Sequence, residues 1–208
     1  MSTFDGLLVG LGNPGPKYAG TRHNLGFMLV DSVLEAAVRE RRAVREQSGA
    51  KFCCRLWRLE LPGGREWLVA APETFMNLSG ESVQPLAAWH RIAPDQILVA
   101  HDELDLAPGR MRFKCGGGNA GHNGLESIAQ RLGTVGFNRL RLGIGRPPRG
   151  GETVNWVLGH FAEADRAAIS LVLPAAVDVV HEFAAKGLEA ATRLSSSFRL
   201  PETADKGL

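Results

Sequence analysis

The chain has 208 residues, of which 44% are hydrophobic and 22% charged, and its formal net charge is +2. These values are those of an ordinary globular protein, and they exclude a disordered or collagen-like chain. The length fits one domain, so we expect residues 1–208 to form a single folded unit. The longest apolar run, at 167–177, contains Ser170 and Pro174 and is shorter than the roughly 20 residues that cross a bilayer, so we expect no membrane helix.

Strand-like and helix-like segments alternate along the chain. In chain order, the patterns predict a strand at 7–11, a helix at 24–42, strands at 52–61 and 67–71, a helix at 79–90, strands at 97–100 and 110–114, a helix at 123–132, a strand at 139–144 and a long helix at 163–185. The sequence PGGR at 62–65 predicts an antiparallel hairpin. This alternation favours the α/β class, with a twisted, mostly parallel mixed sheet flanked by helices. We expect the polar tail, about 200–208, to fray.

The amino terminus and the cysteines bear on the compartment. Residues 1–6 include Asp5 and no basic residue, which does not fit a secretory signal, so we expect a cytoplasmic protein. Cys53, Cys54 and Cys115 are odd in number and form no CxxC pair. We therefore expect reduced thiols rather than a disulfide framework or a metal site.

A glycine-rich loop follows the first predicted strand. The sequence GLGNPG at 10–15 satisfies the GxGxxG dinucleotide fingerprint, but Pro14 and Pro16 delay the helix that should begin there. Asp31 has the spacing of the ribose-binding acid but lies in the middle of a predicted helix. A P-loop is also excluded, because Thr21 and Arg22 stand where Lys and Ser or Thr are required. The loop is therefore a polar strand-end loop, of the kind that often carries function.

Two further polar segments follow predicted strands. HDELD at 101–105 brings three carboxylates and a histidine together, but no further metal ligands converge in the sequence, and we expect no metal. GGGNAGHNG at 116–124 opens a predicted helix, and its amides could cradle an anion. The alternative for this second segment is a flexible loop in which Asn123 is the N-cap of the helix.

Basic residues gather in two stretches. Residues 39–58 hold seven basic residues against Glu40 and Glu46, and residues 109–149 hold eight against Glu126 alone. Clustered arginine and lysine are typical of phosphate binding. The alternative is a solvated face whose charge is balanced by acids that lie nearby in space, and the sequence leaves both open.

Five motifs in order resemble those of the bacterial peptidyl-tRNA hydrolase family. They are VGLGNPG at 9–15 with Tyr18 and TRHN at 21–24, TFMNLSG at 74–80, VAHDELD at 99–105, GHNGL at 121–125 and RLRLGIG at 139–145. The resemblance runs from about residue 7 to beyond Phe161. The departures are modest: Asn119 and Ala120 lie in the glycine loop where relatives often have another small or polar pair, and Arg112 stands where a lysine is common.

The resemblance implies an enzyme that hydrolyses the ester between a peptide and the 3′ ribose of tRNA. Such a reaction needs a base for water and donors for the developing oxyanion, but no redox cofactor. By resemblance, His23 is the catalytic base, since histidine exchanges a proton near neutral pH, and Asp102 orients it. No cofactor and no metal are expected, and the family favours a monomer.

The remaining site residues follow from the same resemblance. Asn13 and Asn77 would hold the peptide carbonyl or the oxyanion, and Asn123 would fix the water or the peptide backbone. Tyr18 and His122 would contribute to substrate binding, and Met76 with the loop 147–157 would form an apolar wall and lid. The acceptor-stem phosphates of tRNA would bind Arg112, Lys114 and Arg141 without base specificity.

Two other classes compete with this prediction. A non-catalytic RNA-binding module would explain the arginines but not the presence together of His23, Asp102, Asn13 and Asn77. A hydrolase of small substrates would need a GxSxG elbow or an HExxH zinc motif, and the sequence contains neither.

Overall fold

The computed structural model describes residues 4–201, which form a seven-stranded sheet in the order β2-β3-β4-β1-β5-β7-β6. The strands are β1 (Gly6–Gly10), β2 (Val44–Gln47), β3 (Cys54–Leu61), β4 (Arg65–Pro72), β5 (Ile97–Glu103), β6 (Met111–Cys115) and β7 (Asn138–Gly143). The central pairs β4–β1, β1–β5 and β5–β7 are parallel, and the outer pairs β2–β3, β3–β4 and β6–β7 are antiparallel. The predicted mixed α/β sheet is confirmed, with the expected hairpin between β3 and β4.

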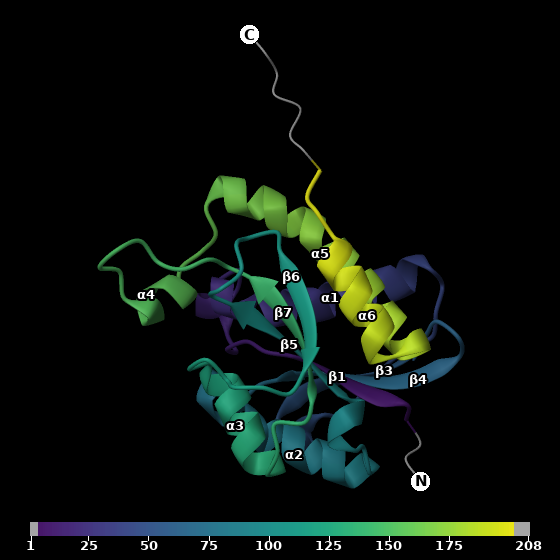
Figure 1. Ribbon diagram of the computed structural model, residues 1–208. Helices are drawn as coiled ribbons and strands as arrows, with labels where there is room; N and C mark the ends of the chain where they lie inside the picture. Colours follow the sequence, from purple (N-terminus) through teal and green to yellow (C-terminus); the bar gives the residue numbers. More distant parts are fainter. Residues whose placement is uncertain (1–3, 202–208) are drawn as a thin grey trace.

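Helices cover both faces of the sheet (Figure 1). They are α1 (Leu25–Arg39), α2 (Ser79–His90), α3 (Asn123–Leu132), α4 (Thr153–Val157), α5 (Glu163–Lys186) and α6 (Leu188–Ser197). Helices α2 and α3 pack on one face, and α1, α5 and α6 on the other, so that each face has its own apolar cluster. Every residue of the central strands β1 and β5 is buried, as expected of parallel strands covered on both faces.

Three short elements were not predicted. Strand β2 is mostly exposed and charged, and α4 lies inside the segment assigned to a lid. Helix α6 begins directly after Gly187, which ends α5 with a positive φ of 81°. The predicted strand 97–100 is also too short, because β5 continues to Glu103 and keeps the polar residues 101–103 inside the sheet.

Helix α5 is the one helix of residues 4–201 that is long and apolar enough, by length and composition, to cross a membrane. Its buried residues include Ile169, Val172 and Val180, which join the apolar cluster shared with α1 and β3. These contacts place one face of α5 in the core, and 33% of its most apolar 18-residue segment is buried. The frayed tail predicted at about 200–208 lies, from residue 202 onward, outside the described residues.

Glycines of the first loop serve close packing between β1 and α1. A Cβ atom at Gly10 would collide with the backbone oxygen of Gly26 in α1, and a Cβ at Gly26 would collide with Ala100 O in β5. A Cβ at Gly12 would lie 2.7 Å from the ring of Phe27. The GxG pattern therefore lets α1 approach the sheet, and this approach brings the start of α1 beside the carboxyl end of β5.

Candidate active site

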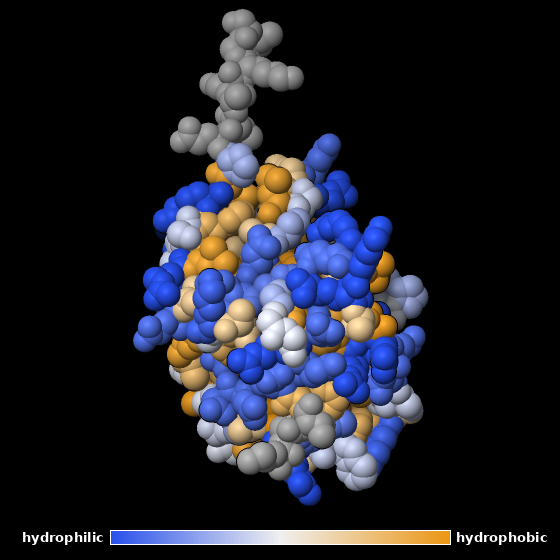
Figure 2. All heavy atoms as spheres, turned by 90° about the vertical axis from the view of Figure 1, so that its right-hand side faces the viewer, coloured by the Kyte–Doolittle hydropathy of each residue, from blue (hydrophilic) through white to orange (hydrophobic). Residues whose placement is uncertain are grey.

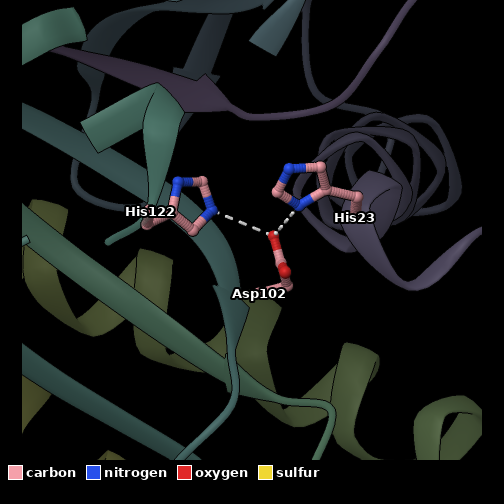
Figure 3. Close-up of side chains that lie close together, drawn as sticks. All are labelled: His23, Asp102 and His122. Carbon is pink, nitrogen blue, oxygen red and sulfur yellow. Dashed lines mark hydrogen bonds and ion pairs between the residues drawn. The ribbon is translucent and has the colours of Figure 1, made fainter. Parts of the chain in front are cut away.

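Three side chains from distant segments meet at the carboxyl end of β5 (Figure 3). Asp102 is 3% exposed and lies near the end of this strand. His23 comes from a short 3₁₀ turn (Arg22–Asn24) before α1, and its Nδ1 lies 2.9 Å from Asp102 Oδ1. His122 comes from the start of α3, and its Nε2 lies 3.0 Å from the same oxygen. One oxygen of the Asp102 carboxylate is thus hydrogen-bonded to two imidazoles.

The hydrogen bonds fix the tautomer of each ring. His122 is the N-cap of α3, and its Nδ1 accepts from the amides of Gly124 and Leu125, so its proton is on Nε2 and is donated to Asp102. The cap is therefore His122 and not Asn123, the alternative raised by the sequence. Burial by itself raises the pKa of Asp102, but the charges and hydrogen bonds of His122 and His23 outweigh it and hold the pKa of this carboxyl well below its usual range. Because Asp102 is an acceptor, His23 donates through Nδ1 and keeps its Nε2 lone pair for another partner.

The same cluster has the spacing of a metal site, since one atom each of His23, Asp102 and His122 lie within 4.8 Å of one another. A metal on His122 Nε2 would move the proton of this ring to Nδ1, where it would oppose the amide hydrogens of α3. The donor set therefore fits a hydrogen-bonded cluster better than a cation.

Two cavities adjoin at His23. The first has a volume of about 370 Å³ and is lined by Asp102, His122 and Arg146 among others. The second, of about 440 Å³, is lined by Asn13, His23, Phe75, Met76, Asn77, Asn123, Val154, Val157 and Leu158. His23, Asn123 and the α4 residues Val154 and Val157 line both. The predicted residues Asn13, Met76, Asn77 and Asn123 are therefore brought together beside His23.

Asn13 is held in one orientation. Its Oδ1 accepts from the amide of Met76 at 2.8 Å, which directs its Nδ2 donor to the opposite side. Asn24 holds the Asn13 backbone from both sides, accepting from Asn13 N at 2.9 Å and donating to Asn13 O at 3.0 Å. Asn13 is thus a preorganised donor at the cavity wall.

Some residues differ from the sequence-based assignment. Tyr18 is half-buried in another 3₁₀ turn and lines neither cavity, so its substrate contact stays a prediction. Asn24 and His101 had received no role. His101 donates from Nδ1 to Asp102 O at 2.8 Å and packs edge-on against His122, and burial lowers the pKa of its imidazole to about 3. Both residues lie inside the motifs TRHN and HDELD, but nothing in those motifs distinguishes a supporting polar group from a reacting one.

The three predicted tRNA-binding cations lie on neighbouring strands. Arg112 and Lys114 of β6 stand opposite Arg141 and Arg139 of β7, respectively. Arg141 Nε donates to Glu103 at 2.8 Å, which links this basic surface to the strand that carries Asp102. Burial lowers the pKa of Lys114, and the positive charges of Arg141 and Arg139 lower it further.

The fold and the site describe a small α/β enzyme that carries acid–base groups at the carboxyl ends of parallel strands. Residues 7–203 match the family described as peptidyl-tRNA hydrolase. The chain is 57% identical over 196 residues to the peptidyl-tRNA hydrolase of Nitratidesulfovibrio vulgaris (strain DSM 19637 / Miyazaki F), which covers 93% of this chain and 97% of the relative. It is 46% identical over 185 residues to that of Mycolicibacterium smegmatis, with 89% and 94% covered.

The crystal structure of the peptidyl-tRNA hydrolase of Acinetobacter baumannii is similar to the whole molecule. The TM-score is 0.86 at 35% identity, with 96% of this chain and 99% of that chain covered. The chain belongs to the peptidyl-tRNA hydrolase family, as the five motifs predicted.

Proposed function

We propose that the protein hydrolyses peptidyl-tRNA at the cavities beside His23, with His23 as the base that activates water and Asp102 as its orienting partner. The observation that carries this proposal is the 2.9 Å contact between His23 Nδ1 and Asp102 Oδ1, which leaves the other ring nitrogen as an acceptor at the cavity wall.

The reaction follows from these groups. His23 Nε2 takes a proton from water as the water oxygen bonds to the ester carbonyl carbon, and the carbonyl oxygen becomes an oxyanion. Asn13 Nδ2, held by the Met76 amide, donates to that oxyanion. The tetrahedral intermediate then expels the 3′ ribose oxygen, which receives the proton from His23. The products are free tRNA and a peptide carboxylic acid, which loses its proton to solvent. Asn77 and Asn123 position the peptide and the water.

The tRNA is held by phosphate contacts. Arg112, Lys114 and Arg141 bind the acceptor stem, and because they bind phosphates they do not select a base sequence. Peptidyl-tRNA is released during translation, so this proposal places the protein in the bacterial cytoplasm. It acts as a monomer.

Release of free tRNA from N-acetylaminoacyl-tRNA tests the proposal, with unblocked aminoacyl-tRNA as the substrate control. We expect His23→Ala to lower kcat by at least about 100-fold, as loss of a general base does. The matched control is His90→Ala, which removes a histidine at the end of α2 that packs against Phe4 and lines neither cavity. Tight tRNA binding without cleavage by the native protein would instead indicate a non-catalytic RNA-binding module.

Chelation tests the metal-independent mechanism. Because His122 Nδ1 is occupied by the amides of α3, we expect EDTA to leave the activity unchanged. Loss of activity that zinc restores would show that the cluster holds a metal ion.

A further inference from the structure

Arg22 precedes the proposed base but faces the other way. Its guanidinium carbon lies 3.8 Å from the centre of the Trp156 ring and 5.4 Å from that of Phe161. Arg22 Nη1 also donates to Trp156 O at 3.3 Å. The residue is 6% exposed, so a charged side chain is enclosed by α4 and the segment that follows it.

The backbone joins the same two segments. Arg22 N donates to Gly159 O at 2.9 Å, and Thr21 forms an antiparallel bridge with His160. A Cβ at Gly159 would lie 3.0 Å from Arg22 Nη1, so the guanidinium packs directly on this backbone. Trp156 is itself held by the loop that follows β7, since its indole nitrogen donates to Gly145 O at 2.8 Å. Arg22 thus connects the turn that carries His23 to the end of α4.

Helix α4 is held through Trp156 and Val157, which pack against the apolar cluster of α1 and α5. Its five residues are exposed or half-buried, with none fully buried, and Val154 and Val157 form the wall that both cavities share. A helix of this length is not stable by itself. The position of this wall relative to His23 therefore depends on the contacts made by Trp156 and its neighbours.

Burying the Arg22 guanidinium beside α4 costs free energy, because its charge is incompletely paired. Its nearest carboxylate is Asp165 at 3.9 Å, and within residues 4–201 its Nε has no hydrogen-bond partner. Burial lowers the pKa of the guanidinium, and Asp165 only partly offsets this. Such a charge can fix the relative position of the groups around it. A planar guanidinium stacks on the indole face of Trp156, and the ammonium group of lysine cannot stack in this way.

We propose that Arg22 is a positioning residue that clamps α4 against the turn of His23, so that the wall formed by Val154 and Val157 is preset before substrate binds. The proposal rests on the proposed function, in which His23 is the base. Arg22 itself does not contact the substrate.

The test compares Arg22→Lys with Arg166→Lys, a matched change at an exposed position of α5. In Arg22→Lys we expect backbone amide exchange at 153–161 to accelerate at least about tenfold, and in Arg166→Lys to stay unchanged. With N-acetylaminoacyl-tRNA, we expect KM to rise at least about fivefold while kcat stays within about twofold, as lost uniform binding does. A merely destabilising change would lower the active fraction, and hence the apparent kcat, without raising KM.

Trp156→Leu removes the ring on which the Arg22 guanidinium stacks, and it provides the test if Arg22 variants fold poorly. It should reproduce the faster exchange and higher KM, and the double variant should be no worse than either single one. Unchanged exchange at 153–161 in both single variants would overturn the proposal. His23→Ala separates the two ideas, because it should lower kcat without altering exchange in α4. If His23→Ala stays active, the proposed base is wrong, whereas fast exchange in Arg22→Lys would still show the clamp.

Discussion

The two basic stretches of the chain look alike in sequence but are built differently in space. In residues 39–58, several cations are balanced by acids: Arg42 Nε lies 2.8 Å from Glu40, Arg58 Nε lies 2.7 Å from Glu66, and Arg55 Nη1 lies 3.9 Å from Asp31. Lys51 lies over the ring of Trp89. Three of the seven cations of this stretch thus have an acid partner and five of the seven are exposed, which favours the solvated face that the sequence had left open. Figure 2 shows the side of the molecule on which β3 and β4 lie, where hydrophilic side chains cover most of the surface.

Residues 109–149 also contain cations that are paired with acids: Arg131 with Glu81, Arg141 with Glu103 and Arg146 with Asp105. Arg112 and Lys114 differ from these, because they are half-buried and face other cations. Arg112 stands opposite Arg141, and Lys114 stands opposite Arg139. Like charges directly opposite each other destabilise a strand pair. Within residues 4–201, no carboxylate lies at ion-pair distance from Arg112 or Lys114. Arg45 and Arg58 also stand opposite each other in the first stretch, but Arg58 is paired with Glu66. Half-buried charge without an acid partner is expected where a polyanion binds, so Arg112 and Lys114 distinguish the proposed tRNA surface.

The largest expected effect is on stability, and it comes from replacing Arg139, the one cation of the second stretch that is fully buried. It donates to Gly118 O and Gly117 O at 2.9 Å each and to Asn119 Oδ1 at 3.1 Å, and so holds the glycine loop that leads to His122. Replacing it leaves these acceptors without their donor, and we expect Arg139→Met to lower the free energy of unfolding by about 3 kcal/mol. Urea denaturation measures this.

Arg58→Met is the matched change in the first stretch. Its ion pair with Glu66 is exposed, so we expect a loss below about 1 kcal/mol. Equal losses in the two variants would contradict the contrast between the stretches.

The next effect concerns substrate affinity. We expect the double change Arg112→Ala and Lys114→Ala to raise KM by at least about tenfold at low salt while kcat changes little, because phosphate contacts bind the ground state and the transition state alike. The slope of log KM against log salt should fall by about one unit for each lost phosphate contact.

The control for this double change is Arg42→Ala with Arg55→Ala, two paired cations of the first stretch. KM should stay within about twofold, since these side chains have carboxylate partners. A tenfold rise in this control would extend the tRNA surface to residues 39–58.

The sequence predicted those parts of the molecule that depend on local pattern. Helices α2 and α3 have the predicted ends, because their apolar periodicity and flanking turns are local signals. Strand β5 was cut short at Ala100, because residues 101–103 are polar and a polar run is not expected inside a buried strand. They lie there because the acid Asp102 is satisfied by His23 and His122, which are 79 and 20 residues away in sequence.

The site shows the same division. The motifs predicted His23, Asp102 and Asn13 as site residues, and this assignment stays a prediction. Which ring nitrogen of His122 carries a proton depends on amides at the start of α3, and the sequence pattern does not show this contact. The sequence also could not predict the ion pairs of residues 39–58, because Arg58 pairs with Glu66 across a hairpin and Arg55 pairs with Asp31 on a different element. Long-range pairing decides both features.

The smallest effect is expected for Glu66→Gln, which removes the balancing acid and leaves Arg58 unpaired. The hydrogen bond from Arg58 holds the pKa of Glu66 below its usual range, although burial opposes it. A carboxyl whose pKa is lower in the folded state stabilises the fold above its unfolded pKa and loses this contribution as the pH falls through the folded pKa. Both side chains are about one-third exposed or more, at 44% and 34%, so solvent screening limits the contribution to less than about 0.5 kcal/mol. Denaturation of the native protein and the variant should therefore differ slightly at pH 7 and coincide once the pH is below the folded-state pKa of Glu66. KM should be unchanged at both low and moderate salt. If Glu66→Gln instead lowered KM, the freed Arg58 would contact tRNA. The first stretch would then differ from the second only because its cations are paired with acids.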